Sequence, residues 1–170
     1  MKKTSIRLIL LFVFLVFLQI WLFDNIHLFG FATPFLYVYF LVKLPISMNR
    51  NLVLILSALL GFIIDIFSGT LGLTMTVTVI IGFVRHYLLK LFAPRDIFDD
   101  YTPSFSTFGK FLFMRYAGVI TLIHIFLLYS LESLSLFTPG LLFLRIASSF
   151  TLTFLLIFAF ESINFDVFKT

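Results

Sequence analysis

The chain contains no cysteine and has few charged residues. Its 170 residues include 8 acids, 12 bases and 3 histidines, and charged residues make up 12% of the chain. The lack of cysteine excludes disulfides, thiol nucleophiles and metal or iron–sulfur centres held by cysteine. A soluble domain carries about 25% charged residues, whereas this chain has too few to cover a surface that faces water. The composition therefore excludes an ordinary soluble fold.

Motifs that carry chemistry are also missing. The sequence has no nucleotide-binding loop, no HExxH motif, no GxSxG elbow and no pair of carboxylates spaced for acid–base catalysis. The histidines, His27, His86 and His124, lie at scattered positions that do not match the spacing of metal ligands. We therefore expect no catalytic residue, no cofactor and no metal site, and we predict that the protein is not an enzyme.

Apolar residues are what the sequence has in abundance. They make up 61% of the chain, and 26 of them are phenylalanine. A helix that crosses a bilayer needs about 20 mostly apolar residues, and six stretches approach this length. We predict an all-α integral membrane protein, with a single polytopic domain over residues 1–170 and a bundle of about six transmembrane helices. The expected spans are residues 6–23, 28–42, 52–67, 71–89, 111–131 and 140–160, of which the second is the weakest.

The bases predict the orientation of these spans. With a cytoplasmic N-terminus, one base falls in the outer half, Arg145, and eleven fall on the inner side. The eleven are Lys2, Lys3, Arg7, Lys43, Arg50, Arg85, Lys90, Arg95, Lys110, Arg115 and Lys169. Lysine and arginine favour the cytoplasmic side of membrane proteins. We therefore predict a multi-pass membrane protein with both termini in the cytoplasm. Because the bases follow the ends of apolar runs, they do not indicate a nucleic-acid partner.

Asp65 stands out because it closes an apolar run, and a carboxylate at the bilayer centre costs about 2.5–3.5 kcal/mol. Gly69 and Gly72 follow it and permit a turn. Three roles for Asp65 are open: a residue solvated beside the turn, a hydrogen-bond acceptor for the turn or a partner helix, or a member of a proton or ion relay. We hypothesise that Asp65 pairs with Arg145. The alternative is that Arg145 extends alone to the outer headgroups.

Small residues recur on two expected spans. Ser57, Gly61 and Asp65 follow one another at four-residue spacing, and a second group contains Ala147, Ser148, Ser149 and Thr151. Small residues let two helices approach closely, so we expect internal packing, with an interface to a partner helix as the alternative. The candidates for a structural or partner-binding site are Ser57, Gly61, Asp65, Gly69, Gly72 and Arg145.

Two further polar groups belong to the last two expected spans. His124 lies inside its span, where we expect it to form a hydrogen bond between helices. Glu161 follows the last span, on the same side as Arg85 and Arg115. Glu161 balances one of these arginines, or the arginines only anchor the helices at the inner surface.

In these features the chain resembles the rod-shape-determining protein MreD family. The residues that carry the resemblance are Gln19 and Phe23 in the first span, Pro34 in the second, and the block of Gly61, Asp65, Ser68, Gly69 and Gly72. The resemblance implies a fold similar to the six-helix substrate-binding subunits of energy-coupling-factor transporters. It also implies a location in a bacterial inner membrane and a scaffold role in peptidoglycan synthesis and cell shape. The implied partners are an MreC-like protein and, through it, the MreB filament, the RodA polymerase and a penicillin-binding transpeptidase.

Two functions of different classes follow. The first is a non-enzymatic subunit of the cell-wall elongation complex that binds an MreC-like protein in the bilayer, through the third and fourth spans and the turn between them. The second is a small-molecule-binding subunit of a transporter, similar to vitamin-binding subunits. Its pocket would be lined by His124, Asp65, Arg145 and the threonines Thr74, Thr76 and Thr78.

Overall fold

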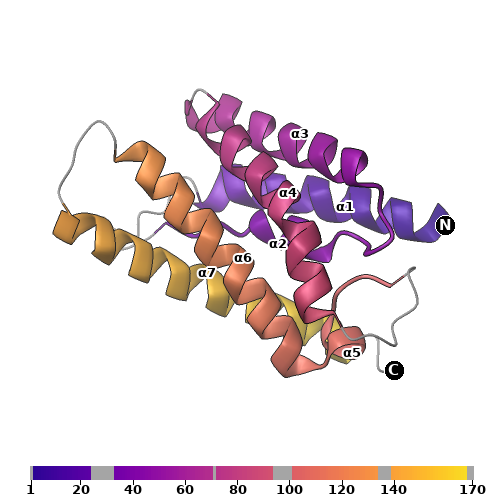
Figure 1. Ribbon diagram of the computed structural model, residues 1–170. Helices are drawn as coiled ribbons and strands as arrows, with labels where there is room; N and C mark the ends of the chain where they lie inside the picture. The colour runs from indigo at the N-terminus through magenta and orange to yellow at the C-terminus, as the bar shows by residue number, and fades with distance from the viewer. Residues whose placement is uncertain (1, 24–32, 71, 94–100, 134–138, 168–170) are drawn as a thin grey trace.

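The computed structural model describes residues 2–23, 33–70, 72–93, 101–133 and 139–167, and the regular elements within them are all helices (Figure 1). They are α1 (Lys2–Leu18), the π-helical turn η1 (Gln19–Phe23), α2 (Val38–Lys43), α3 (Arg50–Ser68), α4 (Leu73–Phe92), α5 (Phe105–Phe108), α6 (Lys110–Glu132) and α7 (Pro139–Val167).

Four of these helices are long and apolar enough to cross a membrane: α3, α4, α6 and the stretch Gly140–Ile163 of α7. Residues 6–21, in α1 and η1, form a shorter apolar helix. The predicted all-α membrane class is confirmed at this level. The count of six spans and the likeness to transporter subunits stay predictions.

The second expected span differs most from its prediction. Of residues 28–42, the first five lie outside the described residues, and residues 33–37 are not helical. Helix α2 has only six residues, which corresponds to a length of about 9 Å. A helix over the whole stretch is therefore not formed. Pro34 contributes to the break, because proline removes a backbone donor and restricts the residue before it.

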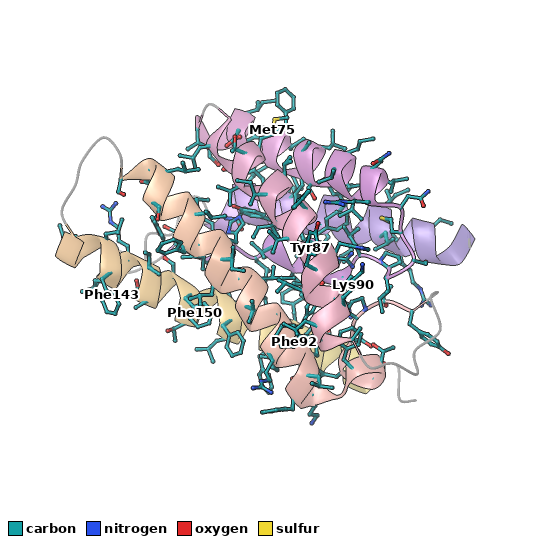
Figure 2. All side chains as sticks on the ribbon, in the orientation of Figure 1. Met75, Tyr87, Lys90, Phe92, Phe143 and Phe150 are labelled. Carbon is teal, nitrogen blue, oxygen red and sulfur yellow. The ribbon has the colours of Figure 1, made fainter. Side chains whose placement is uncertain are left out.

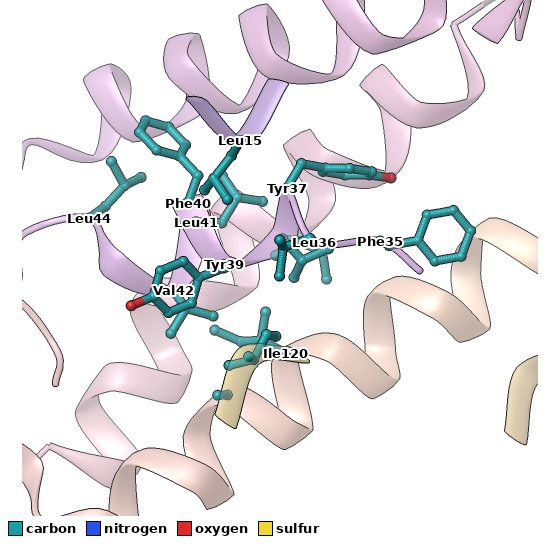
Figure 3. Close-up of a cluster of buried hydrophobic side chains, with 14 of the residues drawn as sticks. Leu15, Phe35, Leu36, Tyr37, Tyr39, Phe40, Leu41, Val42, Leu44 and Ile120 are labelled. Atoms are coloured by element: carbon teal, nitrogen blue, oxygen red, sulfur yellow. The ribbon is translucent and has the colours of Figure 1, made fainter. Parts of the chain in front are cut away.

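Residues 33–45, which we call the buried segment, form the centre of the protein (Figure 3). Residues 36–42 have 0–1% of their surface exposed, including the large rings of Tyr37, Tyr39 and Phe40. Helices α1, α4 and α6 all contact α2. Irregular backbone at membrane depth is tolerated where protein surrounds it, and the buried segment meets that condition.

Helices α3 and α4 form a tight antiparallel hairpin, and α4, α6 and α7 pack in succession (Figure 1). Two glycines permit the close approach within the hairpin. A Cβ atom on Gly61 would collide with the Thr78 hydroxyl and with the Met75 backbone, and one on Gly82 would collide with Ser57. The small residues on these helices are therefore required by the internal packing.

Candidate functional site

Asp65 binds the start of α4 from the end of α3. Its carboxylate accepts hydrogen bonds from the backbone N–H groups of Thr74 at 2.9 Å and Met75 at 2.8 Å, and from the Thr70 hydroxyl at 2.7 Å. The first N–H groups of a helix have no partner inside the helix, and the helix dipole favours negative charge there. Asp65 therefore caps α4. Of the three roles left open, this is the hydrogen-bond acceptor for the turn.

The two glycines of the turn adopt backbone conformations that other residues avoid. Gly69 ends α3 with φ +68° and Gly72 precedes α4 with φ +74°. The N–H groups of Gly69 and Thr70 bond to the Asp65 carbonyl, which is a common way to end a helix. Gly61, Asp65, Gly69 and Gly72 together build one helical hairpin.

Ser57, Gly61 and Asp65 are buried and face α4, which confirms the expectation of internal packing. The Ser57 hydroxyl donates to the Val53 carbonyl at 2.7 Å. Because none of these three side-chain positions is open to the outside, they do not form a surface on which a partner helix packs.

The hypothesis that Asp65 pairs with Arg145 is wrong. Arg145 lies on the exposed side of α7, and its nearest carboxylate is that of Glu132, with 3.9 Å between nitrogen and oxygen. Both partners are about half exposed, at 44% and 50%, so solvent weakens this ion pair. Asp65 satisfies its charge with donors from the turn and the start of α4.

The buried segment is held by polar side chains from surrounding helices. The Gln19 amide donates to the Pro34 carbonyl at 3.0 Å and accepts from the Leu36 N–H at 3.1 Å. Gln19 is 1% exposed and begins the π-helical turn. The Gln19 side chain therefore gives the buried segment both a donor and an acceptor, as a neighbouring backbone would.

Helix α7 supplies two more acceptors to the same backbone. The Thr33 N–H donates to Ser149 Oγ at 3.1 Å and the Phe35 N–H donates to Thr153 Oγ1 at 3.0 Å. Both hydroxyl residues are fully buried and are four residues apart on α7. The Ser149 hydroxyl also bonds the Tyr129 hydroxyl of α6 at 2.9 Å. An unpaired backbone group in a dry interior is costly, and these hydroxyls remove that cost.

Arg85 of α4 binds the other end of the buried segment. Its guanidinium donates to the Leu41 carbonyl at 2.8 Å, to the Leu44 carbonyl, and to the Pro45 carbonyl at 3.4 Å. The last carbonyls of a helix have no partner inside it, and a cation there complements the dipole. Arg85 is 3% exposed, so its charge serves the backbone and not a membrane surface.

Glu161 forms a buried cluster with Lys43. Its carboxylate lies 3.0 Å from the Lys43 ammonium and accepts from the Tyr39 hydroxyl at 2.5 Å and from the Phe105 N–H at 3.1 Å. Of the two alternatives left open by the sequence, the pairing of Glu161 with Arg85 or Arg115 is wrong. The cluster joins α2, α5 and α7.

His124 forms a hydrogen bond to another segment of the chain, although its partner does not lie in a helix as we expected. Its Nε2 atom lies 3.1 Å from the Tyr37 hydroxyl of the buried segment. Three buried polar atoms on α6 have no hydrogen-bond partner among the described residues: the Tyr116 hydroxyl oxygen, the Thr121 hydroxyl oxygen and His124 Nδ1. Thr121 and His124 are three positions apart, so they occupy one face of the helix.

The pocket that we expected for a small molecule is not assembled. Asp65 and Thr74 belong to the α3–α4 turn, Thr78 donates to the Thr74 carbonyl, and the Thr76 hydroxyl donates to the Gly72 carbonyl on the exposed side. His124 faces the buried segment, whereas Arg145 is exposed. Within the part of the chain that the structure describes, no three potential ligands gather into a metal site.

Sequence reasoning did not predict that these polar residues hold the buried segment, although signals for some of them exist. Gln19, Ser149 and Thr153 are polar residues inside apolar runs, and Arg85 lies a full turn before Lys90 at the end of its helix. Such residues are expensive in a membrane unless they have partners. The sequence marks them as partnered but does not identify the partners.

Neither a scan of protein-family models, nor a search of curated proteins, nor a search of solved structures finds a match to this chain.

Proposed function

We propose that this protein is a non-enzymatic membrane subunit of the bacterial cell-wall elongation complex, similar to the MreD family. In this role it binds an MreC-like membrane protein within the bilayer. Through that partner it is connected to the MreB filament, the RodA polymerase and a penicillin-binding transpeptidase. The protein resides in the inner membrane with both termini in the cytoplasm.

One observation carries the proposal: residues behind the family resemblance determine the fold. Gln19 and Pro34 meet where the buried segment enters the bundle. The block that runs from Gly61 to Gly72 lies in the α3–α4 hairpin, in which Gly61 permits close packing and Asp65 caps α4. A chance match of short motifs gives no reason for its residues to cooperate in this way.

The use of the buried polar groups supports a scaffold role. Asp65, Arg85, Gln19, Ser149 and Thr153 all bind backbone groups of the chain itself. Satisfied polar networks rigidify a fold. A rigid membrane subunit of this kind acts through the surface that it presents to another protein.

We place the partner surface on the outward face of α7. Only 17% of the membrane-crossing window of α7 is buried, compared with 33–44% for α3, α4 and α6. Ala147 and Thr151 are exposed there at four-residue spacing, which is the small-residue pattern that lets a second helix approach closely. This assignment replaces the surface expected on the third and fourth spans, whose small residues are buried within the hairpin.

The test is co-purification from mild detergent with the MreC-like protein encoded in the same cell. Thr151→Leu is expected to reduce the recovered partner several-fold because the larger side chain separates the two helices. Thr76→Leu is the matched control, since both threonines are exposed and both donate to the carbonyl four residues earlier. Equal recovery of the partner with both variants contradicts the α7 surface. Absence of an MreC-like protein from the wild-type preparation contradicts the proposed function.

A small-molecule-binding subunit is the second candidate, and it is favoured by two of the buried atoms without partners on α6, those of Thr121 and His124. Thr121 and His124 can receive hydrogen bonds from a polar group that enters between the helices. Native mass spectrometry of the detergent-extracted protein distinguishes the candidates. A stoichiometric metabolite that is lost with Thr121→Val supports the second function, and a spectrum of bare protein supports the first.

A further inference from the structure

Cationic side chains gather at the open end of the α3–α4 hairpin, opposite the turn that contains Asp65. Arg50 begins α3, and His86 and Lys90 lie one turn apart near the end of α4. All three are exposed. Because the helices are antiparallel, the start of α3 lies beside the end of α4. The Arg50 guanidinium lies 4.1 Å from the centre of the Phe83 ring and 5.7 Å from that of Tyr87.

This cluster has no acidic partner among the described residues. The ion pairs between described residues join Lys43 to Glu161 and Arg145 to Glu132, and neither pair lies at the open end. Among the described residues, the charged groups close to His86 are Lys90, Arg50 and Arg85, which are all positive. Arg85 is buried and binds carbonyls, so Arg50 and Lys90 are the strong cations available to a ligand. Within the part of the chain that the structure describes, no acid compensates the positive charge of the open end.

The geometry of Arg50 suits the recognition of an anion. Stacking on an aromatic ring holds a guanidinium in place and leaves the N–H groups along its edge free. These groups match the oxygens of a phosphate, and an ammonium such as that of Lys90 adds a second contact as a point charge. A phosphate between Arg50 and Lys90 is therefore the anion that this end fits best.

An apolar surface continues from the cluster along the hairpin. Phe83 is 45% exposed and Tyr87 52% exposed, and Ile80 and Met75 continue the exposed side of α4 toward the turn. Figure 2 shows Tyr87 and Lys90 near the end of α4 and Met75 at the opposite end of that helix. A ligand with a phosphate at one end and hydrocarbon below it contacts both regions at once. A free phosphate contacts only the cationic cluster.

We propose that the open end of the α3–α4 hairpin is a binding site for an anionic phospholipid. Arg50 and Lys90 bind the phosphate, His86 and Tyr87 border the headgroup, and the acyl chains follow the exposed face of α4. Basic residues between membrane helices are a known basis for recognition of anionic lipids. The site is separate from the partner surface on α7 and goes beyond the proposed function.

The experiment is native mass spectrometry of the full chain in mild detergent, with phosphatidylglycerol or phosphatidylethanolamine added at equal concentration. The wild type is expected to retain more phosphatidylglycerol. In the double variant Arg50→Gln and Lys90→Gln, we expect the affinity for phosphatidylglycerol to fall about tenfold or more, because both strong cations near the headgroup are removed. Should that variant not fold, His86→Gln with Lys90→Gln leaves the Arg50 stack intact and is expected to show a smaller loss.

The matched control is the double variant Lys110→Gln and Arg115→Gln. It removes the same charge from exposed positions, and Arg115 also lies over a ring, 4.9 Å from the centre of Phe111. The control is expected to retain phosphatidylglycerol as the wild type does. Equal loss in both variants, or equal retention of the two lipids by the wild type, overturns the proposal. Displacement of the lipid by millimolar inorganic phosphate also overturns it, since it identifies a site for free phosphate.

Discussion

At the scale of single residues, two buried charges of opposite sign serve the same purpose at opposite ends of α4. Asp65 binds the N–H groups at its start, and Arg85, toward its other end, binds carbonyls in the last turn of α2 and just after it. Each charge is compensated by several backbone dipoles, which supports it without an ion pair. Such residues stabilise helix ends that the bilayer cannot solvate.

Asp65→Ala is expected to destabilise the protein by about 1–3 kcal/mol, because it leaves buried N–H groups without an acceptor. Arg145→Ala is expected to have an effect below about 1 kcal/mol, since its ion pair with Glu132 is exposed. Thermal unfolding in detergent measures both. The double variant is expected to lose the sum of the two effects. A clear departure from additivity would restore the pairing of Asp65 with Arg145.

For Lys43 and Glu161, in contrast, we expect the effects of substituting the two residues on stability not to be additive. Glu161→Gln leaves the buried Lys43 ammonium without its counter-ion, and removing one partner of a buried pair costs about 3–5 kcal/mol. Lys43→Met in the Glu161→Gln background is expected to cost less than Lys43→Met alone, because the charge is already uncompensated. A double-mutant cycle measures this coupling, and a coupling energy near zero would exclude the pair.

The sequence predicts which residues at this scale matter better than it predicts their partners. Asp65 is conspicuous because a carboxylate closes an apolar run, and its role as an acceptor for the turn is among the roles expected. Its donors come from the turn and from the next helix, and their approach depends on the packing that Gly61 permits. One alternative from the sequence paired Glu161 with arginines expected at the same depth in the membrane. In the structure its partner is Lys43 of the buried segment. Depth along a helix does not determine which neighbour a side chain faces.

At the scale of elements, the predictions succeed for long helices and fail for the buried segment. Runs of about 20 apolar residues have one solution in a bilayer, because the helix satisfies its own backbone. Residues 33–37 belong to a stretch that we expected to form a spanning helix, yet they are not helical, and Gln19, Ser149 and Thr153 bind part of their backbone. Pro34 was the local sign of a break. The partners that allow it come from α7 and η1 and cannot be identified from the sequence of the segment itself.

The hairpin of α3 and α4 gives the sharpest prediction at this scale. Gly61→Ala is expected to lower the unfolding temperature strongly, because the new Cβ atom would lie 2.7 Å from the Met75 nitrogen and still closer to the Thr78 hydroxyl. Gly140→Ala is the control, since its Cβ would meet nothing within 4 Å. Thermal unfolding of both variants in one detergent is the measurement. Equal unfolding temperatures would show that the hairpin is not packed as described.

At the scale of the whole molecule, the charges divide between the two ends of the bundle. Arg50 and Lys90 lie at the open end of the hairpin, and Lys110 begins α6 beside α5. Glu132 and Arg145 meet at the opposite end, where α6 finishes and α7 starts. In Figure 1, α3, α4, α6 and α7 run alternately between these two ends. The arrangement has the charge asymmetry that favours a cytoplasmic open end, and that orientation stays a prediction.

The central claim is that this protein binds a second membrane protein through the outward face of α7. Site-specific photocrosslinking in living cells tests it most directly, with the crosslinking residue at Thr151 or, as a control, at Thr76. We predict a crosslink to an MreC-like protein from position 151 and none from position 76. Crosslinks from both positions, or from neither while the protein is inserted in the membrane, would contradict the claim.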